Sequence, residues 1–274
     1  MKLTVLHTYR ADGVHFSRKV TEEPVGIAPT AHIWWEMILV KGGDVVYMVN
    51  GKEYHPRKNS LIITRSLDYH SVSFNSAENY DRYLIVFPEN AMISDVCSRM
   101  PQDLDVLDLN GNEQVLGLFR KMCSYIEQFD SQTVRILLTY MIEEILYNAI
   151  QMAQKAKEAG VRSVNPTINR ALQYINENIT RQFSLDELAD HLHLTKGHVR
   201  RLFVSHMNTT PKQFILSQKL LLARRDLCAG SNATEVSAKY GFADYSGFYR
   251  HYLHHYGHKP SDAMEAATFV DDGF

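Results

Sequence analysis

Apolar and polar positions form short runs in the first third of the chain. The runs IWWEMILV, DVVYMVN, SLIITRS and RYLIVF are separated by glycine, proline and asparagine. Such runs of aromatic and branched residues bounded by turn residues are typical of β-strands. Asn50-Gly51 predicts a type I′ hairpin, because both residues accept positive φ. We therefore expect residues 1–110 to form a small antiparallel barrel or sandwich.

The hydrophobic period changes to that of helices in residues 111–160. One stripe holds Val115, Leu118, Phe119, Met122 and Ile126, and a second holds Val134, Leu138, Met141, Ile145 and Ala149. The second run is apolar on most of its circumference, so it is expected either to pack inside its own domain or to pair with a second subunit. The stretch Ala159–Pro166 (AGVRSVNP) is predicted to be a linker.

Only helical patterns follow this linker. Ser184 and Glu187 form a capping-box pattern that predicts a short helix, LDELADHL. His193-Leu194 is expected to turn the chain, and Thr195 to cap a second helix that ends near Met207. The core face of that helix is predicted to hold Val199, Leu202 and Phe203, and the outward face Lys196, Gly197, Arg200 and Arg201.

The same arrangement recurs about fifty residues later. A short helix begins near Thr234, Gly241 supplies a turn, and Asp244 caps a helix that ends near Tyr256. Its core pair is Phe248 and Tyr252, and its outward residues are Tyr245, Ser246, Tyr249 and Arg250. Residues 214–227 are predicted to be the helix that joins the two units. Two such helix-turn-helix units could enter successive major grooves, roughly 34 Å apart, although a single basic helix face is more often merely solvated.

The overall charge adds little to this interpretation. The chain has 29 Lys and Arg against 31 Asp and Glu, a net charge of −2. From Val161 onward, however, there are 13 basic against 11 acidic residues, and eight of the thirteen histidines. The three cysteines lack metal or redox spacing, and no signal sequence or long apolar run is present, so we expect a reducing, cytoplasmic location without membrane association.

The second helical unit is recognisable by its motif. GFADYSGFYRHYLHHYGHKP resembles the G-F-x-D-x-S-x-F-x-R-x-F-x-x-x-x-G-x-x-P signature of the AraC family of bacterial regulators, and LTKGHVRRLFVSHMNTTPKQFI resembles the family's first unit. The resemblance implies DNA contacts at the eight outward residues named above, of which Arg201 and Arg250 match the family's own arginines. Several positions depart from the pattern: Asn208 or Thr209 for Gly, Lys219 for Arg, and Ala263-Met264 where an arginine is usual.

The strand region resembles, more loosely, the cupin-like sensor domain common in that family. Cupins bind a metal through two histidines and a glutamate early and another histidine late; His32, Glu36 and His70 match three of these places. Two histidines and one carboxylate could hold non-haem iron, so a metal-binding cupin enzyme with a DNA-binding tail is a rival hypothesis. We expect no cofactor, metal or catalysis.

The favoured hypothesis is an effector-controlled transcription activator, α+β in class, with two domains. We expect a polar small molecule, such as a sugar, to bind His32, Trp34, Glu36, His70 and Arg82. His32, Trp34 and Glu36 are expected on one strand face, with Trp35 packed beneath the helices. The alternative is that Trp34 is ordinary core and Glu36 pairs with Arg82. The expected partners are double-stranded DNA (through residues 166–264), RNA polymerase and a second copy of the chain; a regulator controlled by a protein partner remains a further alternative.

Overall fold

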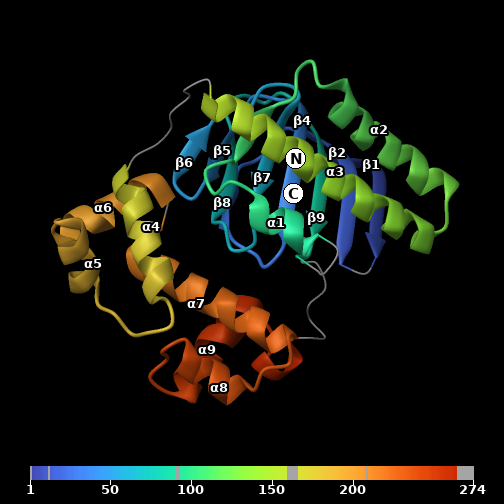
Figure 1. Cartoon of the computed structure of the whole chain (residues 1–274). Coiled ribbons are helices and arrows are strands. Elements are labelled where there is room, and N and C mark those ends of the chain that lie inside the picture. The colour runs from blue at the N-terminus through green and yellow to red at the C-terminus, as the bar shows by residue number, and fades with distance from the viewer. Residues whose placement is uncertain (1, 12, 90–92, 159–165, 208, 264–274) are drawn as a thin grey trace. The chain divides into compact units, whose positions relative to one another are not determined.

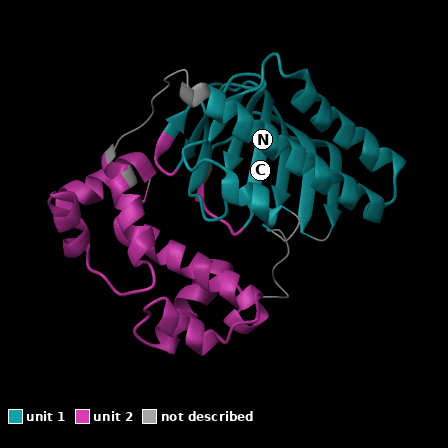
Figure 2. Ribbon diagram, in the orientation of Figure 1, with its two compact units in different colours: residues 1–28, 34–49, 53–163 teal, residues 29–33, 50–52, 164–274 magenta. Residues whose placement is uncertain are grey.

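The computed structural model describes residues 2–11, 13–89, 93–158, 166–207 and 209–263. They form two compact units, coloured separately in Figure 2. The N-terminal unit comprises residues 1–28, 34–49 and 53–163, and the C-terminal unit comprises residues 29–33, 50–52 and 164–274. Most of the linker predicted at Ala159–Pro166 lies outside the described residues, as do Asn208 and Met264.

The strands pair into two sheets in the described part of the chain (Figure 1). The six-stranded sheet has the order β1-β2-β9-β4-β7-β10, and the four-stranded sheet the order β3-β8-β5-β6. The strands are β1 (Lys2–Ala11), β2 (Val14–Glu22), β3 (Ile27–Thr30), β4 (Trp35–Gly42), β5 (Val45–Val49), β6 (Lys52–Tyr54), β7 (Ser60–Thr64), β8 (His70–Phe74), β9 (Tyr80–Phe87) and β10 (Val106–Asp108). The hydroxyls of Tyr47 on β5 and Tyr80 on β9 share a short hydrogen bond, so the two sheets face each other.

The turn chemistry of the sequence is confirmed at Asn50-Gly51. The two residues have φ values of 48° and 76°, as a type I′ turn requires, and they connect β5 to β6. An ordinary side chain disfavours positive φ, whereas asparagine and glycine tolerate it. This local preference explains why the hairpin could be located from two residues.

One face of the six-stranded sheet packs on helices. Three helices follow the strands or lie between them: α1 (Ser94–Arg99), α2 (Glu113–Gln128) and α3 (Ser131–Glu158). Alternate residues of β4 and β9, such as Met37, Leu39, Ile85 and Phe87, join the buried stripes of α2 and α3 in one apolar core. Internal packing is therefore confirmed for the stripe of α3 predicted from its sequence, which includes Val134 and Ile145.

The opposite face of the same sheet is much more polar. Ser17, Lys19 and Thr21 on β2, Glu36 on β4 and Arg82 on β9 are all buried there. Successive strand residues point to opposite faces, so this polar set shares its strands with the apolar set of the helix-packed face. We call it the inner face, because it lies toward the four-stranded sheet that supplies Tyr47.

The C-terminal unit contains only helices among its described residues from 166 onward. They are α4 (Pro166–Asn178), α5 (Leu185–Leu192), α6 (Lys196–Met207), α7 (Pro211–Cys228), α8 (Ala233–Lys239), α9 (Tyr245–Tyr256) and the 3₁₀ turn η1 (Pro260–Asp262). The two short-helix, turn, longer-helix units lie on either side of α7 (Figure 1). Among the described helices, none has the length and apolar character needed to cross a bilayer.

Candidate DNA-binding surface and sensor interior

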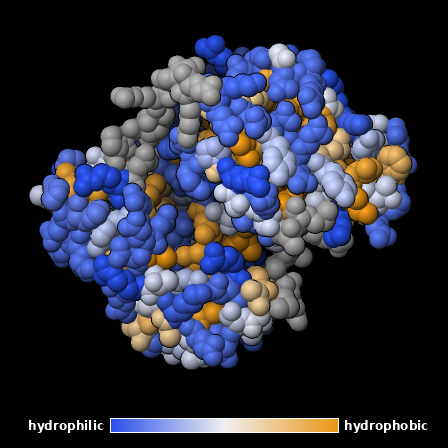
Figure 3. Space-filling model, in the orientation of Figure 1, coloured by the Kyte–Doolittle hydropathy of each residue, from blue (hydrophilic) through white to orange (hydrophobic). Residues whose placement is uncertain are grey.

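The outward face of α6 is basic. Lys196, Arg200 and Arg201 are exposed, whereas Val199, Leu202, Phe203 and Met207 are buried on the opposite side. The ring of Phe203 lies 5.6 Å from that of Phe214 on α7, which fixes the helix by its inner face. The surface above α5 and α6, at the left of Figure 3, is mainly hydrophilic. This arrangement leaves the guanidinium groups available to phosphates or guanine edges.

Two residues of this face have special local contacts. Lys196 Nζ lies 2.7 Å from the carboxylate of Asp186 on α5, and both side chains are largely exposed. Such an exposed pair adds little stability and can be exchanged for a phosphate. A Cβ added at Gly197 would meet only the Arg201 guanidinium, at 3.9 Å, so packing does not require glycine there.

The outward face of α9 is aromatic rather than basic. Phe248 and Tyr252 form the predicted core pair, and both are fully buried. Tyr245, Ser246 and Arg250 are exposed, and Tyr249 is half-buried. The Tyr245 ring lies 6.0 Å from that of Phe248 and 6.2 Å from that of Tyr249, so the two outward tyrosines are held in part by the core.

The caps that position these helices are formed mostly as the sequence predicts. Ser184 and Glu187 complete a capping box at α5, Thr195 accepts a hydrogen bond from the amide of His198, and Asp244 accepts one from the amide of Gly247. His193 adopts a left-handed conformation with φ of 55° in the first turn. The sequence reasoning missed Asn232, whose side chain accepts hydrogen bonds from two backbone amides at the start of α8. An asparagine directly before an Ala-Thr-Glu run was the signal that could have identified this cap.

The sensor residues are only partly placed as expected. The prediction that His32, Trp34 and Glu36 alternate along one strand is wrong, because β4 begins at Trp35 and the two earlier residues precede it. The chain passes there from β3 of one sheet to β4 of the other, which requires a bend. Trp34 is half-buried, whereas Trp35 belongs to the core beneath the helices and stacks on Phe87 at 6.2 Å, as predicted.

His32, Glu36 and His70 are brought together. Their ligand-type atoms all lie within 4.8 Å of one another, and Glu36 and His70 are almost fully buried. His70 Nδ1 lies 2.9 Å from the backbone oxygen of Asp68, so it donates there and directs Nε2 toward Glu36 Oε1, at 4.0 Å. A histidine held through its other nitrogen by a carbonyl has the geometry of a metal ligand, and it equally suits a polar organic ligand.

Arg82 lies deeper on the inner face. Its Nη1 donates to Thr21 Oγ1 at 2.8 Å and to the Tyr80 carbonyl at 3.3 Å, and its guanidinium lies 4.3 Å from the Tyr80 ring. The structure thus places Arg82 against Thr21 and Tyr80. Burial raises the pKa of Tyr80 to about 12 and that of Tyr47 well above its ordinary value, so both hydroxyls stay protonated. Sequence reasoning missed these tyrosines and Lys19, although the alternation of β2 and β9 could have placed Lys19 and Tyr80 on one face.

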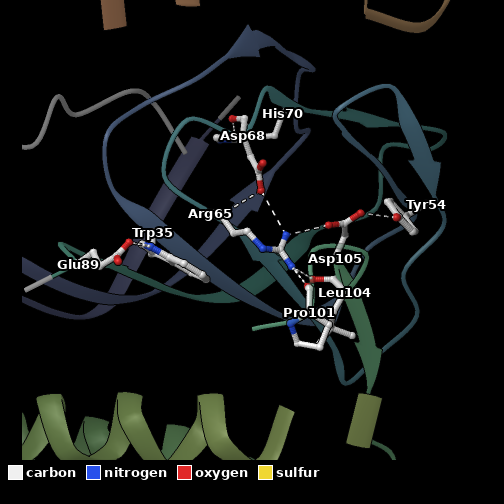
Figure 4. Close-up of polar contacts among 9 residues, drawn as sticks. All are labelled: Trp35, Tyr54, Arg65, Asp68, His70, Glu89, Pro101, Leu104 and Asp105. Carbon is white, nitrogen blue, oxygen red and sulfur yellow. Dashed lines mark hydrogen bonds and ion pairs between the residues drawn. The ribbon is translucent and has the colours of Figure 1, made fainter. Parts of the chain in front are cut away.

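A second buried arginine was also missed. Arg65 bonds to Asp68 and Asp105 through Nη1 and to the carbonyls of Pro101 and Leu104 through Nη2 (Figure 4). Tyr54 also donates to Asp105, at 2.6 Å. Through both Nη atoms of Arg65, this network ties the segment before β10 to the end of β7, which indicates a structural role for Arg65.

Comparison with known proteins agrees with this geometry. A helix-turn-helix domain model matches residues 188–266. The chain is 23% identical to the XylDLEGF operon transcriptional activator of Pseudomonas putida over 87% of this chain and 77% of that protein. It is 20% identical to the lactose operon transcription activator of Staphylococcus xylosus, over 80% and 79%, and 22% identical to the transcriptional activator RhaS of Yersinia pestis, over 84% and 86%. The chain thus carries an AraC-type helix-turn-helix domain and is similar over most of its length to activators of the AraC/XylS family.

Among solved structures, ToxT of Vibrio cholerae is a distant likeness. It is 12% identical, with a TM-score of 0.41, over 94% of this chain and 100% of that one. The helix-turn-helix match and the sequence relatives identify the chain as a DNA-binding transcription regulator.

One departure from the AraC/XylS pattern has a visible structural role. Lys219 stands where the family usually has arginine, and it is buried on α7. Its ammonium donates to the carbonyls of Arg181, before α5, and Tyr240, after α8, at 3.0 and 2.8 Å. Burial lowers the pKa of Lys219. This single cation links both helix-turn-helix units to the helix between them.

Proposed function

We propose that this regulator binds its operator with α6 and α9 in successive major grooves, under the control of a small polar effector on the inner face. In this proposal residues 1–110 are the sensor, residues 111–160 mediate dimerisation, and residues 166–264 bind DNA. The contacts with DNA are made by Lys196, Gly197, Arg200, Arg201, Tyr245, Ser246, Tyr249 and Arg250.

The observation that carries the proposal is the pair of outward helix faces joined by one continuous helix. α7 has 18 residues, which corresponds to about 27 Å of helix. This length is comparable to the roughly 34 Å that separates successive major grooves on one side of the duplex. Both reading helices are fixed to the core by buried aromatic residues, so their spacing is built into the C-terminal unit.

Selection from random duplexes tests this arrangement. The full chain should enrich sites with two sequence blocks about one helical turn apart. Inserting half a turn between the blocks should abolish tight binding, and inserting a full turn should weaken it less if the rest of the protein can adapt. Enrichment of a single block, or equal binding with the half-turn insertion, would contradict simultaneous docking of both helices.

The effector proposal rests on the buried polar groups of the inner face. Glu36, His70 and Arg82 combine an acceptor, a titratable ring and a fixed donor, and Trp34 offers a half-buried aromatic surface beside them in the sequence. A few convergent polar groups are what a polar ligand requires. A carbohydrate or a related metabolite fits this set, and the lactose operon activator is a relative with a carbohydrate operon in its name.

Dimerisation is proposed through α3. Ile136, Tyr140 and Tyr147 remain 43%, 58% and 37% exposed along one side of this helix, although its other stripe is buried. Large apolar groups in a helical row are typical of a protein interface. Tyr140→Lys should shift the sedimentation coefficient from dimer to monomer, whereas the same change at the exposed Phe129 should not. RNA polymerase is the further partner expected of an activator.

A metal in the sensor is the second candidate. If one is bound, His32, Glu36 and His70 would hold it, since their ligand-type atoms already lie within 4.8 Å of one another. A bound ion would supply a Lewis-acid site for a ligand oxygen. Metal analysis of the purified chain tests this: stoichiometric iron or manganese that is lost in His70→Ala would favour it.

A further inference from the structure

The structure buries two arginines in the N-terminal unit, and their surroundings differ. Arg65 is 7% exposed and Arg82 is 3% exposed. Arg65 meets the carboxylates of Asp68 and Asp105. The contacts of Arg82 with described residues are with neutral groups: the Thr21 hydroxyl, the Tyr80 carbonyl and the Tyr80 ring.

This difference matters because a guanidinium stays ionised at any pH at which proteins are folded. Lysine or histidine can respond to burial by losing a proton, but arginine cannot. A buried charge is costly unless an opposite charge and hydrogen bonds compensate it. Neutral oxygens and an aromatic face compensate Arg82 only in part, whereas Arg65 has two carboxylates.

The sheet register places a second basic side chain near Arg82. Lys19 on β2 is its direct cross-strand neighbour, and it is buried on the same face. Among the described residues buried on this face, the acidic one is Glu36. Its cross-strand partner on β9 is Val86, four residues beyond Arg82, which corresponds to about 13 Å along the strand.

We propose that the effector carries a carboxylate and that Arg82 binds it. The inference rests on the proposed sensor role of the inner face and narrows the ligand from polar molecules in general to acids, sugar acids included. A planar carboxylate matches the donor fork of a guanidinium. The Tyr80 ring lies 4.3 Å from the Arg82 guanidinium, and its hydroxyl, which shares a hydrogen bond with that of Tyr47, offers a partner for a second ligand oxygen.

Thermal unfolding of the ligand-free full chain gives the first test. Arg65→Met leaves Asp105 buried with one strong partner fewer, so it should lower Tm by roughly 6–20 °C. Arg82→Met removes a partly compensated charge, so its Tm should stay within about 3 °C of the parent. An equally large loss in Arg82→Met would mean that Arg82 is already satisfied and structural, which overturns the proposal.

Matched ligand pairs give the second test, at constant ionic strength. The probes are sodium D-glucuronate against D-glucose, sodium phenylacetate against phenylacetamide, and sodium hexanoate against hexanamide. At least one acid should raise the Tm by about 2 °C or more, and its neutral partner should not. Arg82→Met should abolish this rise, and Arg82→Lys, which keeps the charge but loses the fork, should retain part of it.

The outcomes separate this inference from the proposed function. If a neutral compound raises the Tm of both the parent and Arg82→Met, the effector hypothesis stands, but the proposal of a carboxylate bound by Arg82 is overturned. If no acid in the panel raises the Tm of the parent, this result also contradicts the proposal of a carboxylate effector. Selection of DNA by the parent chain is a separate measurement, and failure of the parent to select DNA would overturn the proposed function independently of the acid.

Discussion

The two helix-turn-helix units share an architecture but present different chemistry. In the first, α6 directs Lys196, Arg200 and Arg201 outward. In the second, α9 directs Tyr245 and Tyr249 outward, with Arg250 beside them. The inner faces are alike, since each is anchored by a fully buried phenylalanine, Phe203 or Phe248. The folding requirement is therefore conserved between the units, and the outward residues are free to differ.

This difference predicts that the two units contribute in different ways to DNA affinity. Cationic side chains gain affinity by neutralising phosphates, and this gain weakens as salt rises. Tyrosines bond phosphates or pack on thymine methyl groups without releasing a counterion. The first unit is expected to supply most of the electrostatic attraction, and the second a contribution that depends less on salt.

The largest expected effect follows from removing the central arginine of α6. Arg201→Ala should weaken operator binding by about 1–3 kcal/mol if the guanidinium bonds a guanine, and should relax specificity at that position. If it contacts phosphate, the loss should be smaller, uniform across sequences, and accompanied by a salt slope reduced by about one. Titrations of labelled operator at several salt concentrations distinguish these cases.

The matched variants sharpen the comparison. Tyr249→Ala should weaken binding without changing the salt slope, because it removes no charge. Arg120→Ala, an exposed arginine of α2, changes the net charge equally but should leave operator affinity unaltered. A salt slope reduced as much by Tyr249→Ala as by Arg201→Ala would contradict this predicted difference.

The sequence predicted this surface well because its signals are local. The capping box at Ser184, the cap at Asp244 and the periodicity of Phe248 and Tyr252 each depend on residues within one helical turn. The paired outward faces follow from those signals. By contrast, three of the partners of Arg65 lie 36 to 40 positions away at Pro101, Leu104 and Asp105, and no local pattern could identify them.

The inner face of the N-terminal unit shows the same limit. Alternation could place Glu36 and Arg82 on buried strand faces, but not the bend before Trp35 that displaces His32 and Trp34 from β4. That bend depends on which sheet each strand joins, a property of the whole fold. Tyr47 and Tyr80 meet across two sheets for the same reason.

The next largest effect concerns the acid that holds the second unit to α7. Asp226 accepts hydrogen bonds from Lys239 at 2.6 Å and from Tyr240 at 2.7 Å. Burial by itself would raise the pKa of Asp226, but these bonds outweigh it and hold the pKa below its ordinary value. The resulting stability is present above the unfolded pKa and is lost as pH falls through the folded value.

Asp226→Asn should lower the free energy of unfolding by roughly 1–2 kcal/mol at pH 7. Its stability should also depend less on pH between about 5 and 2 than that of the parent. Urea unfolding across this pH range measures both. The first unit provides the control: Glu187→Gln should have a smaller effect, because Glu187 is 45% exposed, although its bonds to the Ser184 amide and Arg181 also lower its pKa. Equal losses of unfolding free energy in Asp226→Asn and Glu187→Gln would contradict the predicted difference between the two units.

The caps of the two short helices should differ by less. Ser184→Ala breaks both arms of the capping box, because the variant loses the hydroxyl and loosens Glu187, and should cost about 1 kcal/mol. Asn232→Gly removes one capping side chain, but glycine is tolerated at the N-cap position, so the change should cost only a few tenths of a kcal/mol. Chemical denaturation of both variants measures the difference, and a larger loss for Asn232→Gly would reverse the ranking.

The smallest expected effect has the opposite sign. Gly197 lies in the exposed first turn of α6, where a methyl group would meet only the Arg201 guanidinium at 3.9 Å. Alanine restricts the unfolded chain more than glycine and suits a helix better, so Gly197→Ala should stabilise the C-terminal unit by up to about 1 kcal/mol. If glycine is present because DNA approaches the backbone closely, the same variant should bind its operator more weakly despite its higher stability.

Gly117→Ala on α2 is the matched control, since its added Cβ also meets a single guanidinium, that of Arg120 at 3.8 Å, and it should leave DNA binding unchanged. Operator affinity unaffected by Gly197→Ala would remove residue 197 from the DNA-contacting set and leave the basic residues of α6 to account for its contribution.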